Sequence, residues 1–407
     1  MTIQPTAQSY RPGEVLVRLK PETEGITDVF EDLSPTTVER LDDPRQGVVE
    51  GGGLYRLVLP EGGATEQAMA RLQTDPRVGY AAPNHVYTLD ERRVPDDLDQ
   101  GFFGTALWGM EKIQAPEAWG TTVGAHDGPI VAVLDTGADV THPDLQGNLW
   151  TNPGEIPGNG VDDDKNGVVD DVHGYNPAHN SGDLRDIHRH GTHTAGTIAA
   201  VGNNGRGVVG VNWEARVMPI RIFDEDGSTD VATIVKGLEY ATRMGARITS
   251  NSWGGTRYNR ALEEAFAASP ALHVAAAGNS RIDNDRVPHY PSSFDLPNLV
   301  SVAASDKRDR LASFSNYGAE SVDLAAPGVG IKSTLPGDRY GSMSGTSMAC
   351  PHVAGVAALI ATAVPQASNQ EIKDRLLGGV DRNGSLEGKV RSGGRLNAAR
   401  ALNPSRH

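Results

Sequence analysis

One serine of the chain lies in a setting that favours nucleophilic chemistry. Ser347 belongs to the run Gly345-Thr-Ser-Met-Ala-Cys-Pro-His-Val-Ala-Gly355, in which a turn-forming pair precedes a long segment of small and apolar residues. The segment predicts a buried helix with Pro351 in its first turn, where a missing backbone N–H costs little. A helix N-terminus presents free N–H groups and a positive dipole end, which stabilise a developing negative charge. Ser347 is therefore a candidate nucleophile.

Three further residues could complete such chemistry. A serine hydroxyl needs a base, a group that orients the base, and donors for the oxyanion. Asp135 directly follows an apolar run, and His190 opens a segment that predicts a helix. Asn279 offers a side-chain amide to the oxyanion, beside the backbone N–H of Ser347. The order along the chain is Asp, His, Ser.

From Trp108 onward, short apolar runs alternate with helical segments, which predicts an α/β fold with a parallel sheet covered by helices on both faces. Functional residues gather at the carboxyl ends of strands in such sheets, and both Asp135 and Asn279 follow an expected strand. The expected strands are 130–134, 216–222, 246–251, 273–277 and 300–304, and the expected helices are 193–201, 228–244, 258–268 and 347–364.

The N-terminal part has a different pattern. Residues 11–89 predict a small α+β domain, with alternating strand patterns and one helix. The expected strands are 14–20, 54–59, 77–81 and 85–89, and the expected helix is 65–72. We expect residues 1–10 to be a disordered lead, 90–107 an exposed linker and 108–407 the large domain.

Composition restricts the class of protein. The 407 residues carry a net charge of −15, from 37 basic and 52 acidic residues, which argues against nucleic-acid binding through the whole surface. No apolar run looks long enough to span a membrane. The single cysteine, Cys350, excludes internal disulfides, and we expect a small buried side chain there. Residues 1–10 lack the pattern of a secretory signal.

The segments around Asp135, His190, Asn279 and Ser347 together resemble the motifs of the subtilisin-like serine proteases, the subtilase family, over residues 108–401. The resemblance implies a serine endopeptidase that cleaves protein or peptide substrates through an acyl-enzyme. It implies Ser347 as nucleophile, His190 as general acid and base, Asp135 as the carboxylate that orients it, and Asn279 as oxyanion donor. Members of the family are mostly secreted, whereas this chain has no recognisable signal, so a secreted or a cytoplasmic location is left open.

Residues 11–89 resemble the propeptide of this family, an intramolecular chaperone and inhibitor. The resemblance implies a monomeric proenzyme that processes itself, with residues 90–107 including the start of the mature enzyme. Residues 85–89 resemble the propeptide tail that enters the active site, so we expect cleavage near Leu89. A non-enzymatic alternative is a zymogen held permanently inhibited, or a binding relative.

Two segments match those with which the family clamps an extended substrate, a form of recognition by strand addition. Trp253 either packs against a strand end or borders a substrate pocket. His289 matches a position near the floor of the primary specificity pocket, and its size and polarity argue against a broad apolar preference. The residues of the two segments are Gly227, Ser228, Thr229, Ser252, Trp253 and Gly254.

An acidic segment predicts a calcium loop. Asp162, Asp164 and Asn166 occupy alternate positions and are followed by a glycine that permits the turn. An EF-hand would need a carboxylate where His173 stands, so the loop must close otherwise, through Asp170 or Asp171. The alternative is a solvated acidic loop.

A second calcium site rests on the resemblance. Asp144 matches a calcium ligand of the family, and a nearby loop matches the segment that completes that site, through the side chain of Asn204 and the carbonyls of Gly202, Arg206 and Val208. Calcium that binds only the folded enzyme would stabilise it by mass action.

A zinc hydrolase is the alternative from another class. His188, His190 and His193 have metal-ligand spacing, and Asp183 or Asp186 could join them. This alternative explains neither the Ser347 motif nor Asn279. We instead expect His193 to be a buried, hydrogen-bonded side chain, and His352 likewise.

Overall fold

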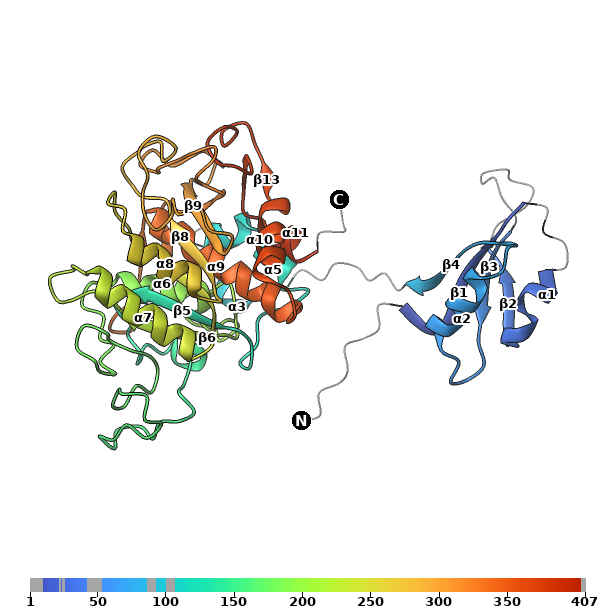
Figure 1. The fold of residues 1–407 in the computed structure, drawn as a ribbon, viewed down its shortest axis with the longest axis horizontal. Coiled ribbons are helices and arrows are strands. Elements are labelled where there is room, and N and C mark those ends of the chain that lie inside the picture. Colours follow the sequence, from blue (N-terminus) through green and yellow to red (C-terminus); the bar gives the residue numbers. More distant parts are fainter. Residues whose placement is uncertain are drawn as a thin grey trace. The chain divides into compact units, whose positions relative to one another are not determined.

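The computed structural model describes residues 10–21, 23, 26–41, 53–85, 93–99 and 107–403. The chain divides into two compact units, residues 1–90 and 91–407 (Figure 1). Each unit has buried apolar clusters of its own.

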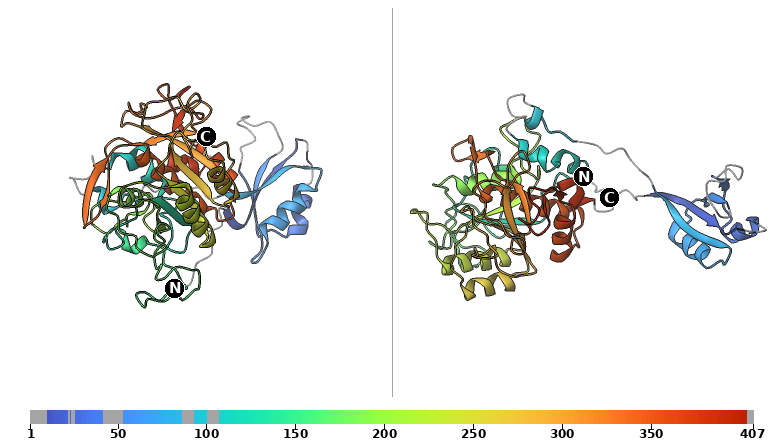
Figure 2. Two further views of the ribbon diagram at one scale, coloured as in Figure 1. Left: turned by 60° about the vertical axis from the view of Figure 1, so that its left-hand side comes forward. Right: turned by 90° about the horizontal axis from the view of Figure 1, so that it is seen from above.

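The N-terminal unit is a four-stranded antiparallel sheet in the order β2-β3-β1-β4 (Figure 2). Val15, Val17 and Leu19 of β1 are buried and pack with Phe30 and with Leu72 of α2 on the same face. The elements are β1 (Tyr10–Leu19), α1 (Ile26–Phe30), η1 (Glu31–Leu33), β2 (Thr37–Arg40), β3 (Leu54–Val58), α2 (Thr65–Gln73) and β4 (Val78–His85).

Three of the expected elements of this unit are found with small shifts, namely β1, β3 and α2. The expected strands 77–81 and 85–89 differ from the structure, because a single strand, β4, spans residues 78–85; residues 86–89 lie outside the described part. Strand β2 was not expected. All four of its residues are exposed, so no alternation of apolar and polar residues marks it in the sequence.

An eight-stranded sheet organises the second unit, in the order β13-β14-β10-β9-β8-β7-β5-β6. All neighbours are parallel except β13 and β14. The expected α/β fold is therefore confirmed. Its strands are β5 (Ile130–Asp135), β6 (Arg216–Arg221), β7 (Ala246–Asn251), β8 (Leu272–Ala276), β9 (Leu299–Ser305), β10 (Leu324–Pro327), β13 (Asp381–Arg382) and β14 (Gly394–Arg395).

Helices cover both faces of this sheet. Alternate residues of β5 face opposite clusters: Val131 and Val133 join one with the helices α6 and α9, while Ala132 and Leu134 join the other with α7 and α8. The helices are α3 (Asp96–Asp99), α4 (Trp108–Lys112), α5 (Ala115–Ala118), η2 (Gln146–Asn148), α6 (His190–Ala199), α7 (Val231–Arg243), α8 (Arg260–Ala268), α9 (Thr346–Ala363), α10 (Asn369–Gly378) and α11 (Ala398–Leu402). A hairpin of β11 (Ile331–Leu335) and β12 (Arg339–Met343) precedes α9.

The helix that carries Ser347 corrects two predictions. By length and composition α9 could span a membrane, so the expectation that no apolar run is long enough was wrong; 83% of it is buried inside the unit, as a core helix. Pro351 is not in its first turn, because the helix begins at Thr346. The missing N–H of Pro351 leaves the carbonyl of Ser347, four residues earlier, without its intrahelical donor.

Candidate active site

The carboxylate of Asp135 and the imidazole of His190 are in direct contact. Asp135 is the last residue of β5 and is buried, and His190 is the first residue of α6. His190 Nδ1 and Asp135 Oδ1 are 2.7 Å apart, and Thr194 Oγ1 donates to Asp135 Oδ2 at 3.1 Å. A carboxylate oxygen accepts, so Nδ1 carries the proton and Nε2 keeps a lone pair. Burial opposes the charged imidazolium, but the charge and hydrogen bond of Asp135 outweigh it and raise the pKa of His190.

Asp186 fixes the start of α6, and the sequence suggested it only as a zinc ligand. Its buried carboxylate accepts from Thr136 Oγ1 at 2.8 Å, next to Asp135, and from Thr192 Oγ1 at 2.6 Å. The backbone N–H groups of 188, 189 and 192 also donate to it, at 2.8–3.0 Å. Asp186 therefore joins the turn after β5 to the first turn of α6.

Ser347 lies in the first turn of α9, which packs against α6. Its Oγ donates to the carbonyl of Ser252 at 3.0 Å, and Ser252 Oγ donates to the carbonyl of Ser347 at 2.9 Å. That carbonyl is the one left free by Pro351. Among the described residues no hydrogen bond joins Ser347 to His190. Catalytic hydrogen bonds are often long or absent in sites without substrate. Rotation of the Ser347 hydroxyl would redirect its proton from the carbonyl of Ser252 to His190.

Asn279 follows β8 and points its amide at the start of α9. Its Oδ1 accepts from the backbone N–H of Thr346 at 2.8 Å and from Thr346 Oγ1 at 3.1 Å. A backbone N–H can only donate, so its contact identifies the oxygen, and the NH₂ group of Asn279 remains available as a donor. We name Asp135, Asp186, His190, Asn279 and Ser347 the catalytic cluster.

The expected substrate segments lie next to this cluster. Ser252 contacts Ser347 directly. The segment of Gly227, Ser228 and Thr229 forms a turn in which Ser228 N and Oγ donate to Asp224, and a Cβ built on Gly227 would lie 3.3 Å from the ring of His188. Trp253 packs partly buried against Phe266, with ring centroids 6.3 Å apart, which supports the packing alternative.

The three histidines of the zinc alternative have separate partners. His188 Nε2 contacts the carbonyl of Asp224 at 3.3 Å, His190 contacts Asp135, and His193 Nε2 contacts the carbonyl of Ile331 at 2.9 Å. His193 is buried, and burial lowers its pKa to about 4. Among the described residues, the histidines do not form a group that could hold a metal ion.

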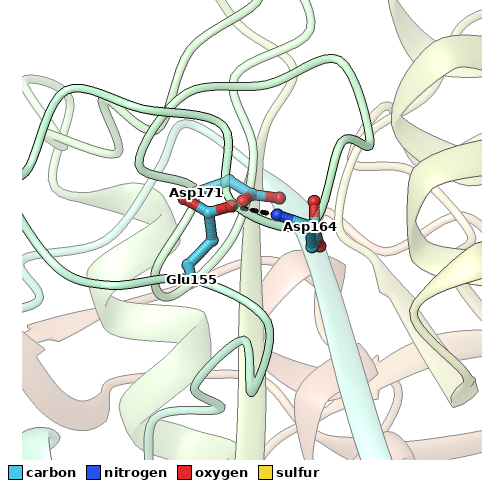
Figure 3. Close-up of side chains that lie close together, drawn as sticks. All are labelled: Glu155, Asp164 and Asp171. Carbon is cyan, nitrogen blue, oxygen red and sulfur yellow. Dashed lines mark hydrogen bonds between the residues drawn. The ribbon is translucent and has the colours of Figure 1, made fainter.

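A group that could hold a metal ion consists of Glu155, Asp164 and Asp171, here named the acidic cluster (Figure 3). One ligand oxygen of each lies within 4.8 Å of the others. Asp171 is fully buried and accepts from Tyr240 Oη and Asn166 Nδ2. Glu155 is 8% exposed, and its Oε2 is buried with no hydrogen-bond partner.

The five ligands expected for this loop have different surroundings in the structure. Asp164 and Asp171 belong to the acidic cluster, and Asn166 donates to both. Asp162 and Asp170 instead accept backbone N–H groups, from residues 166 and 167 and from 158 and 160 respectively. The sequence does not predict Glu155 as a ligand, because Glu155 precedes the motif in which acidic residues occupy alternate positions.

The second expected calcium segment also folds around carboxylates. Buried Asp144 accepts from Asn204 Nδ2 at 2.7 Å and from the N–H of Val208 at 3.1 Å. The N–H of Arg206 donates to Asn204 Oδ1 at 3.0 Å, and that of Gly202 pairs with the carbonyl of residue 213. Burial raises the pKa of Asp144. The expected carbonyl ligands stay a prediction.

Asp97, which lies in the predicted linker, contacts the same loop. Its carboxylate accepts from the N–H groups of Asn203 at 2.5 Å and Arg206 at 3.2 Å, and it is 1% exposed. Burial raises the pKa of Asp97 to about 6. The sequence offered only an Asp-Asp pair in a charged stretch as a signal, which does not distinguish Asp97 from solvated neighbours.

A parallel sheet with an Asp at the end of a strand, and a His and a Ser in the first turns of two helices that pack against each other, is typical of a serine hydrolase of the subtilisin type. The sequence profile described as "Subtilase family" matches residues 126–391, and one described as "Fervidolysin N-terminal prodomain" matches residues 2–84. The chain belongs to the subtilase family: it is a subtilisin-like serine protease with an N-terminal propeptide.

Several named proteases are similar to the chain. A thermophilic serine proteinase of Bacillus sp. (strain AK1) is 34% identical over 359 residues, which cover 87% of this chain and 79% of that protein. Thermitase of Thermoactinomyces vulgaris is 38% identical over 66% of this chain and 86% of its own. A solved protease structure from Pseudoalteromonas arctica superposes with a TM-score of 0.61 at 29% identity, over 74% of this chain and 97% of that one.

Proposed function

We propose that this subtilase is an endopeptidase in which Ser347 attacks the peptide carbonyl and His190 takes its proton. The contact of His190 Nδ1 with Asp135 supports this assignment most, because it leaves Nε2 as the free base. The charge and hydrogen bond of Asp135, which raise the pKa of His190 against the effect of burial, stabilise the imidazolium that forms as the proton is taken. His190 then returns the proton to the leaving amine, and water hydrolyses the acyl-enzyme by the same steps in reverse order.

Asn279 stabilises the oxyanion in this proposal. Thr346 holds the amide oxygen, which leaves the NH₂ group free to donate, and a Cβ built on Gly345 would lie 3.6 Å from both Asn279 Nδ2 and the backbone N of Ser347. The segments 227–229 and 252–254 bind the substrate as an added strand, which recognises peptide backbone. Endopeptidase action on proteins follows from this mode of binding.

A covalent label tests the role of Ser347. A fluorophosphonate should modify the full chain once, and peptide mapping should place the label on Ser347. Ser347→Ala should lose labelling and reduce kcat by roughly 10⁵-fold or more. Labelling at another residue, or an unlabelled protein that still cleaves peptides, would contradict the assignment.

We also propose that residues 11–89 are an inhibitory propeptide, that 90–107 contain the start of the mature enzyme and that 108–407 form the catalytic domain. The family match of residues 2–84 and the separate core of this unit support it. The mature chain must retain Asp97, which contacts the loop of residues 203–206. Intact-mass analysis should show cleavage near Leu89 in the wild type and none in Ser347→Ala; equal processing of both would exclude self-cleavage.

Calcium is the metal that we propose for the acidic cluster. Carboxylate oxygens are hard ligands, and the buried Glu155 Oε2 without a partner is what a bound cation would satisfy. Glu155, Asp164 and Asp171 would hold the ion, which would supply structural charge compensation. Asp144, Asn204 and the loop to Val208 are the proposed second site. Titration calorimetry on Ser347→Ala protein should show calcium binding that Glu155→Gln weakens.

A further inference from the structure

Four asparagines of the chain are followed directly by glycine, and the proposed function makes no use of this pair. In such a pair the backbone nitrogen of the glycine can attack the side-chain carbonyl carbon of the asparagine, because glycine has no side chain to hinder the approach. The cyclic imide that forms releases ammonia, and water opens it to aspartate or isoaspartate. The pairs are therefore candidate sites of spontaneous deamidation. They begin at Asn159, Asn166, Asn204 and Asn383.

The side chains of all four asparagines take part in a turn of the same kind. In each pair the asparagine Oδ1 accepts a hydrogen bond from the backbone N–H two residues further on, at 2.8–3.0 Å. This bond therefore does not distinguish the pairs. What differs between them is the surroundings of the two nitrogens that the reaction changes, the attacking nitrogen of the glycine and the departing Nδ2 of the asparagine.

In three of the pairs a carboxylate holds the attacking nitrogen. It accepts from the glycine N–H at 2.9–3.0 Å. The attack requires this nitrogen to lose its proton, and a negatively charged partner opposes the build-up of further negative charge there. The three bonds run from Gly160 to Asp170, from Gly167 to Asp162 and from Gly205 to Asp96.

Carboxylates also hold the departing nitrogen in the same three pairs. The distances from Nδ2 to the carboxylate oxygens are 2.7–3.0 Å. Hydrogen bonds to charged groups are stronger than those between neutral groups, so they resist the rotation that would present the side-chain carbon to the glycine. The bonds run from Asn159 to Asp163, from Asn166 to Asp164 and Asp171, and from Asn204 to Asp144.

The pair of Asn383 and Gly384 differs at both nitrogens. Within the described part of the chain, neither the N–H of Gly384 nor Nδ2 of Asn383 has a hydrogen-bond partner. Gly384 is exposed, and a Cβ built on it would meet no heavy atom within 4 Å. Nothing in the described fold therefore opposes the attack at this pair.

We propose that Asn383 is the residue at which the folded protein deamidates, and that carboxylates protect the other three asparagines. Gly384 N forms a bond to Asn383 Cγ, the bond from Cγ to Nδ2 breaks, and the proton of Gly384 N passes through water to the departing ammonia. Water then adds to one of the two carbonyl carbons of the imide, and the bond from that carbon to nitrogen breaks. The product has one more negative charge, next to the end of β13. This inference does not depend on the peptidase activity.

The test follows the four pairs in one chain. Full-length Ser347→Ala protein, chosen to prevent self-digestion, is kept below its melting temperature at mildly alkaline pH and mapped by peptide mass spectrometry over time. Conversion at Asn383 should be about tenfold faster or more than at the other pairs, because each hydrogen bond to a charged group that must break contributes about that factor. A peptide of residues 380–387 gives the rate without the fold, and Asn383 in the protein should convert at a similar rate.

Two variants change the reaction in opposite directions. Gly384→Ala should slow conversion at Asn383 severalfold, because the added methyl group hinders the attack while the open space around it leaves the fold intact. Asp96→Ala, a change at an exposed aspartate, should raise conversion at Asn204 by about tenfold, because it frees the glycine N–H of that pair. Asp127→Ala, at another exposed aspartate, is the matched control and should change no rate.

Equal rates at the four pairs would overturn the inference. So would an intact Asn383 under conditions in which its peptide deamidates, or an unchanged rate at Asn204 in folded Asp96→Ala protein. If Asp96→Ala raises the rates of all three protected pairs together and lowers the melting temperature, the variant has lost its fold. The comparison of the four pairs within the parent chain then decides, since it needs no substitution near them.

Discussion

The catalytic cluster and the acidic cluster both gather carboxylates, but they satisfy them differently. Every carboxylate oxygen of Asp135 and Asp186 accepts a hydrogen bond from the protein. In the acidic cluster Glu155 Oε2 is buried without a partner, beside two further carboxylates. A buried polar group without a partner costs free energy. The comparison teaches that the chain alone satisfies the carboxylates of the first cluster, whereas the second has a buried oxygen that the proposed calcium ion would satisfy.

The largest effect is expected in the catalytic cluster. Asn279→Ala should lower kcat by about 10²- to 10³-fold, a range known for an oxyanion donor of subtilisin, because the amide acts only on the transition state. KM and the melting temperature should change little, since the side chain is exposed and, among the described residues, its hydrogen bonds are those that its oxygen accepts from Thr346. Steady-state kinetics on a small peptide measures both constants. A loss of less than tenfold would remove Asn279 from the mechanism.

Chelation should separate the two clusters. With Ser347→Ala protein, to prevent self-digestion, EDTA should lower the melting temperature by roughly 5–10 °C, because an ion at 100 times its Kd contributes about 2.7 kcal/mol. Glu155→Gln should reduce this drop, and Glu387→Gln, a change at an exposed glutamate, should not. Calorimetric melting with and without calcium measures it. An equal drop in Glu155→Gln and the parent would place the cation elsewhere.

The effect of Asp186→Asn should be smaller and visible in the pH profile. Asp186 positions α6 and its charge contributes to the raised pKa of His190. The variant should lose about tenfold in kcat through positioning, less than the roughly 10²- to 10⁴-fold that general-base catalysis contributes, because His190 itself is kept. Loss of the charge lowers the pKa of His190, so more of the base is neutral in acid and the acid limb of kcat/KM moves to lower pH. In the control variant Asp127→Asn, which changes an exposed aspartate, the acid limb of kcat/KM should stay at the wild-type pH. If the limb also stays in place in Asp186→Asn, the role of Asp186 is purely structural.

Short-range signals in the sequence pointed to four residues of the catalytic cluster, namely Asp135, His190, Asn279 and Ser347. Asp135 and Asn279 follow apolar strands, and the parallel fold that brings strand ends together was itself predictable from alternating strands and helices. The sequence does not assign Asp186 to this cluster or Glu155 to a metal site. Asp186 is defined by a partner that is distant in the chain, and Glu155 by the absence of a hydrogen-bond donor. Asp186 accepts from Thr136, 50 residues earlier, and Glu155 is defined by an atom that has no donor.

The helix of Ser347 shows a similar limit. Its existence was clear from composition, but its first residue was not, and Pro351 was therefore placed one turn too early. Helix boundaries depend on caps and tertiary contacts that the local sequence does not fix. The donor that replaces the missing N–H comes from Ser252, 95 residues earlier in the chain.

The replacement of the missing N–H of Pro351 by the hydroxyl of Ser252 affects how the start of α9 is held. Ser252 and Ser347 are bonded twice, hydroxyl to carbonyl in each direction, and the bond from Ser252 Oγ to the carbonyl of Ser347 is kept when the Ser347 hydroxyl rotates toward His190. The carbonyl of Ser347 accepts from Ser252 in place of the N–H that Pro351 lacks, so a displacement of residue 252 is transmitted to the first turn of α9. A proline, usually a defect in a helix, thereby couples the proposed substrate segment to the helix that carries the proposed nucleophile.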